Sequence, residues 1–464
     1  MLIDFTVENF RSFQNEEKFS MVASNKLQDH MEHCVSVEGL SQRLLRAGVI
    51  YGANASGKSN LVKAMAFAQQ LIRVKSGGAI GKLASNQFRF SAVRRPSRFE
   101  FRFVARGKIF SYGFSITPEH VEEEWLNRNE PNEKELVVFQ RKKQIISIGK
   151  NRGLFSGAAD ASKQTLKALQ VLKPRADQLL LNRLLDVDVT SQGELLQPVV
   201  WWFAACLTTI QPNTAFGPLV DFLENVDLFR SFASKFLNTL GTGIDELFID
   251  KTSLEAEKLP KDVLAVLQST RDGESSIAFG DPSVVFQFAP DDPSKVIRRN
   301  ISARHQIRRD SFLMPFQEES DGTRRCLDFL PALFHIKTQE MVFVVDEINR
   351  SLHPLLCHAL LKFFLSEQSE INQQQMIATT HETHLLDQEL LRRDEVWFVE
   401  KDAAQASHIY SLSDMNVRND VKLEKGYLNG RFGGIPIIGD AKKLQDMIVS
   451  SANGKPNGKK KTPH

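Results

Sequence analysis

Two strand-like runs lie within the first 51 residues, and a helical pattern follows soon after them. Residues 2–10 alternate between apolar and polar side chains, and a second apolar run, residues 47–51, ends at Gly52. From residue 60 to 74 the apolar positions recur every three or four residues, as in Leu61, Met65, Ala68 and Ile72. The pattern predicts a strand, a glycine-containing turn and a helix.

Strand and helix patterns alternate along the rest of the chain. Short alternating runs between residues 88 and 116 predict antiparallel strands joined by hairpins, and alternation returns at 275–301. From about residue 162 helical spacing dominates with few strand signals, and no heptad pattern persists, which disfavours a long coiled coil. The continuous apolar run from Met341 to Val345 predicts a strand that is buried on both faces.

These patterns predict an α/β protein in four parts. We expect the two parts of one nucleotide-binding head at residues 1–161 and 276–450, with a helical insert at 162–275 that serves dimerisation or partner contact. The last residues, 451–464, are rich in Gly, Asn and Lys and are predicted to be a disordered basic tail.

Composition narrows the class of protein. The 464 residues include 59 Lys and Arg against 56 Asp and Glu, and a net charge of +3 is too small to predict coating by nucleic acid. No run of about 18 apolar residues is present, so a membrane-spanning helix is not expected. The acidic residues near the start do not fit a secretory signal. Four cysteines without a C-x-x-C pair predict buried thiols and a cytoplasmic protein: Cys34, Cys206, Cys326 and Cys357.

The turn after residue 51, Gly52-Ala53-Asn54-Ala55-Ser56-Gly57-Lys58-Ser59, matches a phosphate-binding P-loop. In such a loop the backbone N–H groups and the helix N-terminus hold the phosphates of a nucleotide. A plain glycine-rich turn is disfavoured by the strand, turn and helix order. We expect ATP and Mg²⁺ here, with Lys58 on the terminal phosphates and Ser59 on the metal. The residues predicted to bind the nucleotide are Gly52, Asn54, Ser56, Gly57, Lys58 and Ser59.

Two carboxylates follow the buried strand at 341–345. Asp346 is the predicted Mg²⁺ partner, and Glu347 is the predicted general base for attack on the γ-phosphate. A carboxylate that only caps a helix is the alternative, which the P-loop makes less attractive. Lys58 and Asp346 are 288 residues apart in the sequence, so a large insertion must separate two parts of one head.

Two further segments predict phosphate contacts. Ser320-Asp321-Gly322-Thr323 opens a helical run, and exposed N–H groups at such a turn bind anions. Because one head does not need two γ-phosphate sites, we expect Ser320, Gly322 and Thr323 to act on the nucleotide of another copy; a simple helix cap is the alternative. His381 follows an apolar run and is predicted to contact the γ-phosphate or the attacking water. The residues around it do not spell H-E-x-x-H, so no zinc protease is expected.

Taken in order, these motifs resemble a known family. Asn9-Phe10-Arg11-Ser12-Phe13, the P-loop, Ser-Asp-Gly-Thr, the segment 346–354, Thr-Thr-His and the segment 425–436 resemble ABC-type ATPases of the RecF, SMC and OLD group. The chain looks most like the stand-alone bacterial branch with RloA and the ATPases of anti-phage systems. That resemblance implies an ABC-type P-loop ATPase head with an antiparallel β subdomain and an inserted helical lobe. It also implies a homodimer or higher oligomer with two ATP molecules between P-loops and signatures.

Two positions depart from the family pattern. Asn349 stands where members of this branch often carry Asp, and we expect a change in communication between the half-sites. The family's Q-loop glutamine is hard to place, and Gln87 is the candidate, with a surface strand residue as the alternative.

Three functions remain open from the sequence. OLD nucleases continue into a Toprim domain, whereas only 83 residues follow His381 here without a D-x-D cluster, so no intrinsic nuclease is expected. The first hypothesis is an antiviral ATPase that senses a phage-derived trigger and controls a separate effector such as a nuclease. The second is a RecF-like repair ATPase that binds DNA directly, and the third is an ATP-binding scaffold with little hydrolysis.

Clusters of basic residues bear on the choice. If they gather on one face, they favour DNA binding, whereas scattered clusters are ordinary solvated surface. The clusters are Arg94-Arg95, Arg98, Arg141-Lys142-Lys143, Arg298-Arg299, Arg304, Arg308-Arg309 and Lys459 to Lys461.

Overall fold

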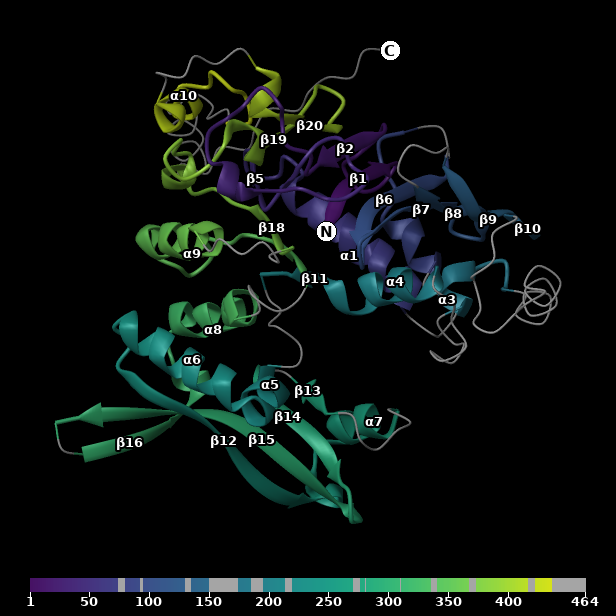
Figure 1. Cartoon of the computed structure of the whole chain (residues 1–464). Coiled ribbons are helices and arrows are strands. Elements are labelled where there is room, and N and C mark those ends of the chain that lie inside the picture. Colours follow the sequence, from purple (N-terminus) through teal and green to yellow (C-terminus); the bar gives the residue numbers. More distant parts are fainter. Residues whose placement is uncertain are drawn as a thin grey trace, which may run out of the picture.

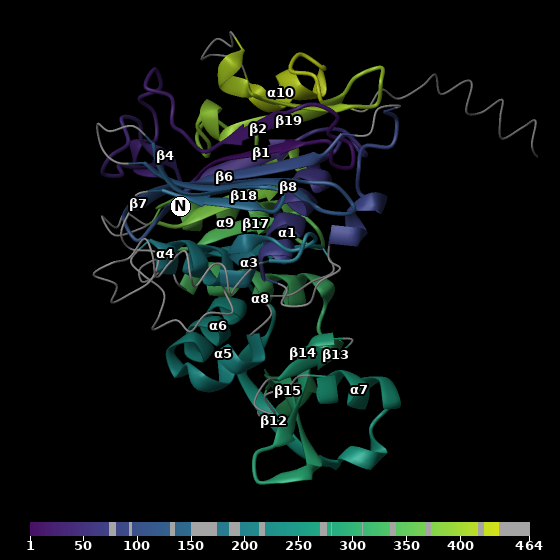
Figure 2. The same cartoon turned by 90° about the vertical axis from the view of Figure 1, so that its right-hand side faces the viewer.

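The chain forms an upper body of two sheets with helices between and beside them, and a lower lobe that carries a third sheet (Figure 1). The lobe lies below the upper body in both views (Figure 2). The structure, a computed structural model, describes residues 1–73, 80–91, 95–129, 135–149, 174–184, 195–212, 219–269, 276–279, 281–308, 310–334, 340–366, 373–415 and 422–435.

A six-stranded sheet is the centre of the upper body. Its strand order is β11-β17-β18-β5-β19-β20, and all neighbours are parallel except β19 and β20. Helix α1 (Lys58–Arg73) follows β5, and α9 (Pro354–Ser366) comes after β17. Every residue of β5, β17 and β18 is buried, which explains their nearly continuous apolar sequences. The strands are β5 (Ala47–Tyr51), β11 (Leu207–Ile210), β17 (Val342–Val345), β18 (Gln375–Thr379), β19 (Val396–Lys401) and β20 (Ser407–Ser411).

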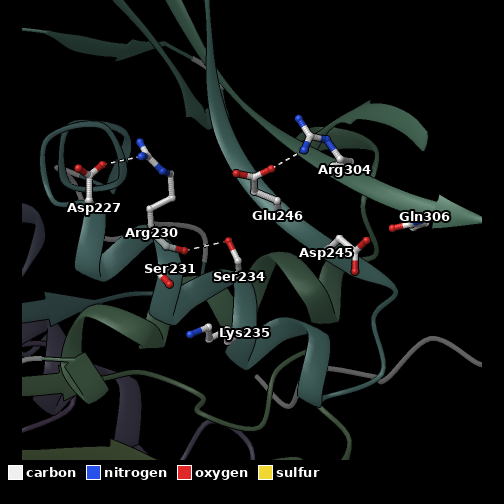
Figure 3. A pocket seen from close by; sticks show the side chains of 9 residues that line it. All are labelled: Asp227, Arg230, Ser231, Ser234, Lys235, Asp245, Glu246, Arg304 and Gln306. Atoms are coloured by element: carbon white, nitrogen blue, oxygen red, sulfur yellow. Dashed lines mark hydrogen bonds and ion pairs between the residues drawn. The ribbon is translucent and has the colours of Figure 1, made fainter. Parts of the chain in front are cut away.

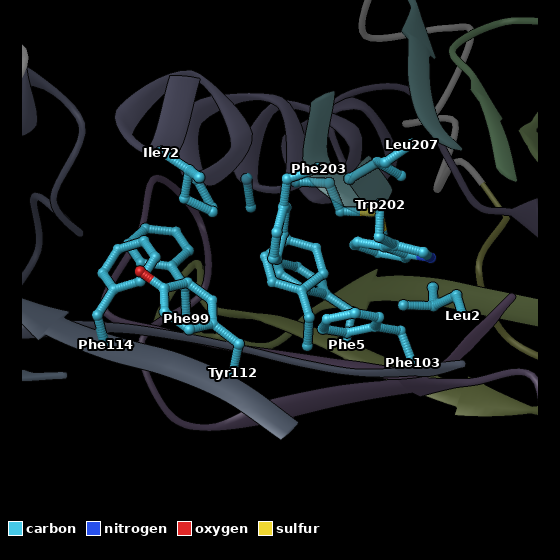
Figure 4. Packing of buried hydrophobic residues seen from close by; sticks show 14 of the residues in the cluster. Leu2, Phe5, Ile72, Phe99, Phe103, Tyr112, Phe114, Trp202, Phe203 and Leu207 are labelled. Atoms are coloured by element: carbon cyan, nitrogen blue, oxygen red, sulfur yellow. The ribbon is translucent and has the colours of Figure 1, made fainter. Parts of the chain in front are cut away.

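A seven-stranded antiparallel sheet, in the order β10-β9-β8-β7-β6-β1-β2, forms the second layer. Its inner face packs aromatic rings against α1 and the turn after α4 (Leu196–Trp201), as Figure 4 shows. The ring centroids of Phe103 and Trp202 lie 4.2 Å apart. The strands are β1 (Leu2–Glu8), β2 (Glu17–Ser20), β6 (Ser97–Ala105), β7 (Lys108–Ile116), β8 (Val121–Asn129), β9 (Leu136–Lys142) and β10 (Ile145–Ile148). A two-stranded pair, β3 (Cys34–Val35) and β4 (Leu44–Leu45), lies beside this layer, and α3 (Leu180–Leu184) contacts α1.

The lower lobe combines the four helices α5 to α8 with a twisted antiparallel sheet. Helices α5 (Leu219–Asn225) and α6 (Asp227–Thr239) pack on the sheet, and α8 (Asp321–Phe334) contacts α6. The other elements are α7 (Lys261–Ser269), β12 (Ile244–Glu255), β13 (Ile277–Phe279), β14 (Asp281–Ala289), β15 (Asp292–Ile307) and β16 (Asp310–Pro315).

The α/β class and the antiparallel subdomain predicted from the sequence are confirmed. The prediction of few strands within 162–275 is wrong at two places, because β11 joins the central sheet beside β17 and β12 pairs with β15. Neither strand shows a clear alternating pattern, since β11 has four residues and most of β12 is solvent-accessible. Both are specified by distant pairing partners. The four-part division stays a prediction, and the tail at 451–464 lies outside the described residues. No described helix has the length and apolar character needed to cross a membrane.

Candidate nucleotide-binding site

The predicted P-loop forms the turn between β5 and α1. Gly52 and Gly57 have φ angles of 157° and 120°. A Cβ atom at Gly52 would collide with the Val399 carbonyl oxygen, and one at Gly57 with the Ser407 hydroxyl. Glycine is therefore required at both positions by conformation and by the close approach of β19 and β20.

Lys58 points back into its own loop. Its ammonium donates to the carbonyl oxygens of Gly52 at 2.6 Å and Ala53 at 3.0 Å, and its Nζ lies 3.5 Å from His381 Nδ1. Burial lowers the pKa of Lys58 to about 8, although Asp346 and Glu347 favour the charged form. The ammonium thus lies in a largely buried position that is lined by carbonyl oxygens and where a phosphate group could also bind it.

Asp346 and Glu347 follow directly after β17, at the carboxyl end of the central sheet. The hydroxyl of Thr379, at the end of β18, donates to Asp346 Oδ1 at 2.7 Å and accepts from the Glu347 N–H at 2.8 Å. Glu347 has a φ of 53°, so the chain turns sharply between the two carboxylates. One threonine therefore holds the carboxylate of the predicted Mg²⁺ partner and the backbone of the predicted base.

His381 lies beside the Lys58 ammonium, with its Nδ1 3.5 Å from Lys58 Nζ. Its backbone N–H and the Thr380 hydroxyl both approach Asn349 Oδ1, at 3.4 and 2.9 Å. Burial and the nearby Lys58 charge lower the pKa of His381. The Asn349 side chain thus supplies one acceptor oxygen to Thr380 and His381, and an aspartate at this position could supply the same acceptor.

The structure places the remaining P-loop residues around this point. Asn54 is exposed at the tip of the loop, and Ser59 is half-buried in the first turn of α1. Ser56 is buried; its carbonyl accepts from the Ser407 hydroxyl at 2.5 Å, while its own hydroxyl has no protein partner among the described residues. Lys58, Asp346, Glu347 and His381 are therefore brought together with the P-loop.

The predicted signature lies apart from this group. Ser320 precedes α8, where its hydroxyl accepts from the Thr323 N–H at 3.1 Å and lies 2.9 Å from the Thr323 hydroxyl. A Cβ atom at Gly322 would lie 2.8 Å from the Ser351 carbonyl, in the turn after Glu347. In the described part of the chain, no hydrogen bond or ion pair joins the three signature residues to the P-loop of the same chain.

Gln87 lies in the turn after the short helix η2 (Ile80–Ser85), so its alternative placement in a strand is wrong. Its amide donates to the Arg95 carbonyl at 3.1 Å. The Q-loop role stays a prediction.

Two residues that matter for the site were not assigned roles from the sequence. Thr379 lay inside the recognised Thr-Thr-His run, but only the fold shows that its hydroxyl faces Asp346. Tyr427, in α10 (Leu423–Leu428), accepts a hydrogen bond from the Gly52 N–H and donates to the Gly434 carbonyl at 3.0 Å. Burial raises the pKa of Tyr427. Tyr427 thus links the glycine-containing segment after α10 to the first glycine of the P-loop.

A separate pocket of about 520 Å³ lies in the lower lobe between α6, β12 and β15 (Figure 3). Its lining balances acids against bases: Arg230 pairs with Asp227, and Arg304 pairs with Glu246. The groups predicted to bind the nucleotide are not among its lining residues.

The described basic clusters are spread over the molecule and largely satisfied by acids. Arg141 is buried against Glu124, and Arg299 pairs with Asp221 and Glu224. Arg98 pairs with Glu100 at 2.8 Å and stacks over the Trp125 ring. Arg94, Arg309 and Lys459 to Lys461 lie outside the described residues.

The chain is similar to several known proteins. The SMC head domain from Thermotoga maritima is 13% identical, with 88% of this chain and 98% of that chain covered and a TM-score of 0.36. An SMC head bound to the C-winged helix domain of ScpA is also 13% identical, with 88% and 97% covered and a TM-score of 0.38. No curated protein matched. A family model matches residues 49–153 and 199–387, more than half of the chain, and spans the P-loop, signature and paired carboxylates. The chain is therefore a P-loop ATPase that belongs to the family described as "AAA domain, putative AbiEii toxin, Type IV TA system".

Proposed function

We propose that the chain is an ABC-type ATPase that closes as a dimer around ATP and controls a separate effector, such as a nuclease, in bacterial anti-phage defence. The convergence of Lys58, Asp346, Glu347 and His381 beside the P-loop carries the ATPase part of this proposal. The family's description, which names a putative toxin in a TA system, supports a role alongside a second protein.

The residues present suit Mg²⁺ and ATP. The Ser56 hydroxyl is buried and free of protein partners among the described residues, and the largely buried Lys58 ammonium would gain a charge partner from a phosphate group. Ser59 and Asp346 would hold the metal, which neutralises charge on the transferred phosphoryl group. Glu347 would take the proton of the attacking water, and His381 would orient that water or the γ-phosphate.

The position of the signature supports the dimer. Ser320 is exposed and Thr323 is turned toward it, so both hydroxyls lie at the N-terminus of α8, where N–H groups favour an anion. Gly322 fits closely under Ser351, which ties the signature to the turn that carries Glu347. A second copy whose nucleotide contacts this signature could then respond, through this turn, to changes at Glu347.

Mixing two inactive variants tests the trans arrangement. Lys58→Ala removes the phosphate contact of one chain, and Ser320→Arg blocks its signature. A mixed dimer of the two retains one composite site with an intact Lys58 and an intact Ser320. We expect ATPase activity to return toward half of the wild-type value per mixed dimer. No recovery in demonstrated mixed dimers would contradict the arrangement or reveal strictly coupled sites.

The exposed face of the lower lobe is the proposed contact for the effector or trigger. Helices α5 and α6 of this lobe lie away from the P-loop, and the lobe's pocket presents both signs of charge, which suits contact with a polar partner surface. Lys235→Glu, on the exposed side of α6, should abolish co-purification with a protein encoded nearby while ATPase activity persists. Lys362→Glu, on the exposed side of α9, is the matched control and should retain the partner.

The effector hypothesis also requires that the chain itself has no nuclease activity. We expect purified protein to leave plasmid DNA and RNA intact with Mg²⁺ or Mn²⁺. Cleavage that is lost on changing an acidic residue of this chain would favour an OLD-like nuclease. Tight duplex binding with a steep salt dependence would favour the RecF-like alternative, and ATP binding without turnover would favour the scaffold.

A further inference from the structure

A cluster of two histidines and a glutamate lies in the turn before β3, away from the nucleotide-binding residues. His30 Nδ1 is 3.2 Å from Glu32 Oε1, and His33 Nε2 is 3.9 Å from the same oxygen. One ligand atom from each residue lies within 4.8 Å of the others. His30 has a φ of 45°, and this left-handed turn stacks its ring on that of His33, with centroids 4.9 Å apart.

Each ring has an acceptor on its other nitrogen. His30 Nε2 lies 2.8 Å from the Gln388 carbonyl oxygen, and His33 Nδ1 lies 3.1 Å from the buried Glu395 carboxylate. A carbonyl or carboxylate oxygen at these distances accepts from the ring, so these two nitrogens carry protons. Glu32 Oε1 likewise accepts from His30 Nδ1, and a bound metal ion would take the place of that proton. Metal-binding histidines show this same outer hydrogen bonding, which fixes the tautomer and the ring orientation.

The spacing suits a small divalent ion. Zinc bonds to histidine nitrogen and carboxylate oxygen at about 2.0–2.2 Å, so the ligand atoms of a tetrahedral ion lie roughly 3.3–3.5 Å apart. The two nitrogen-to-oxygen separations, 3.2 and 3.9 Å, bracket this value, and the two histidine nitrogens lie within 4.8 Å of each other. Side-chain movement of up to roughly 1.5 Å would bring the three ligand atoms to the spacing of a tetrahedral ion.

Acidic groups offset most of the positive charge beside the cluster. The buried Arg392 is paired with Asp394 through two contacts of 2.9 and 3.0 Å. Arg43 is the other neighbouring base; it is exposed, and its guanidinium lies 3.7 Å from the sulfur of Met31. Glu395 adds a fully buried carboxylate behind His33.

We propose that His30, Glu32 and His33 form a zinc-binding site, with the fourth position of the ion open to water. The site goes beyond the ATPase function and has a structural consequence. Its outer hydrogen bonds end at Gln388 and Glu395, just before β19, so the ion would fasten the turn before β3 to the corner that leads into the central sheet.

Zinc content of protein purified without a histidine tag tests the proposal. We expect one zinc per chain by inductively coupled plasma mass spectrometry after incubation with zinc chloride and desalting. His30→Ala and Glu32→Gln should each lower this content to less than about a tenth. Both side chains are partly accessible, and both variants keep the buried pair of His33 and Glu395, so folding should persist. A chelator should lower the melting temperature of the wild type but not of His30→Ala.

His120→Ala is the matched control. His120 also has a glutamate two residues later, with Nε2 and Glu122 Oε1 2.7 Å apart, but it does not belong to the three-residue cluster. This variant should retain zinc at the wild-type level. Wild-type protein that retains no zinc, or zinc content unchanged in both His30→Ala and Glu32→Gln, would overturn the proposal.

Discussion

Thr379→Val is the sharpest test of how the predicted Mg²⁺ partner Asp346 and the backbone of the predicted base Glu347 are held. The substitution keeps the shape of the side chain and removes its hydroxyl, which donates to Asp346 and accepts from the Glu347 N–H. Thr379 and Asp346 are 0% and 2% exposed, so water cannot readily replace either hydrogen bond. The variant therefore leaves a buried carboxylate oxygen and a backbone N–H without their partner.

The magnitude follows from these two bonds. A hydrogen bond to a charged group contributes about 1.5–3 kcal/mol and one between neutral groups about 0.5–1.5 kcal/mol. We expect the free energy of unfolding to fall by about 2–4 kcal/mol. Because Thr379 orients a proposed metal ligand from behind, the Mg²⁺ concentration for half-maximal ATPase activity should rise roughly 10- to 100-fold.

Denaturant unfolding and a Mg²⁺ titration of ATPase activity measure the two effects. Thr379→Ser restores the hydroxyl and should recover most of the Mg²⁺ affinity, although it loses a buried methyl group. If Thr379→Val has wild-type stability and an unchanged Mg²⁺ requirement, the proposed role of this threonine is refuted.

Three further predictions concern buried polar groups. Burial lowers the pKa of Lys58 to about 8, so above pH 8 the side chain must take up a proton before its charged form can bind ATP, and affinity should fall up to about tenfold per pH unit. Calorimetry in two buffers near pH 8.5 should detect this proton uptake on binding, and no uptake would contradict the prediction. Tyr427→Phe removes the link between Gly52 and Gly434 and should reduce stability by about 1–2 kcal/mol and weaken ATP binding, as thermal melts and nucleotide titrations would reveal. Burial raises the pKa of Asp328 to about 7, against the opposing effect of Arg325. The folded state then binds the extra proton, so the free energy of unfolding should decrease from pH 4 to 7, and Asp328→Asn should remove that contribution in denaturant titrations.

The local parts of the site were predictable from the sequence. The P-loop could be recognised because strand β5, the two glycines and α1 are consecutive, and the glycines are needed for conformations that other residues rarely adopt. The run from Met341 to Val345 likewise predicted β17 and the two carboxylates after it. These features depend on short-range sequence alone.

Other parts depend on contacts between distant residues. The four-residue strand β11 is defined by its pairing with β17, more than a hundred residues later, so helical spacing around it was misleading. The hydrogen bond between Tyr427 and Gly52 joins two segments that are far apart in the sequence. The hydrogen bond between His33 and Glu395 also joins residues that are far apart in the sequence. Sequence periodicity carries no signal for such pairings, although the H-x-E-H spacing at His30 could have been noticed.

The central claim is that two copies enclose ATP between P-loop and signature, and sizing of Glu347→Gln tests it most directly. This variant removes the proposed base but keeps Lys58, Ser59 and Asp346, so it should retain ATP and trap the closed dimer. Light scattering should then give one chain mass without nucleotide and twice that mass with ATP and Mg²⁺, and Lys58→Ala added to the same chain should abolish the shift. A Glu347→Gln protein that binds ATP with Mg²⁺ and stays at its nucleotide-free mass would contradict the account.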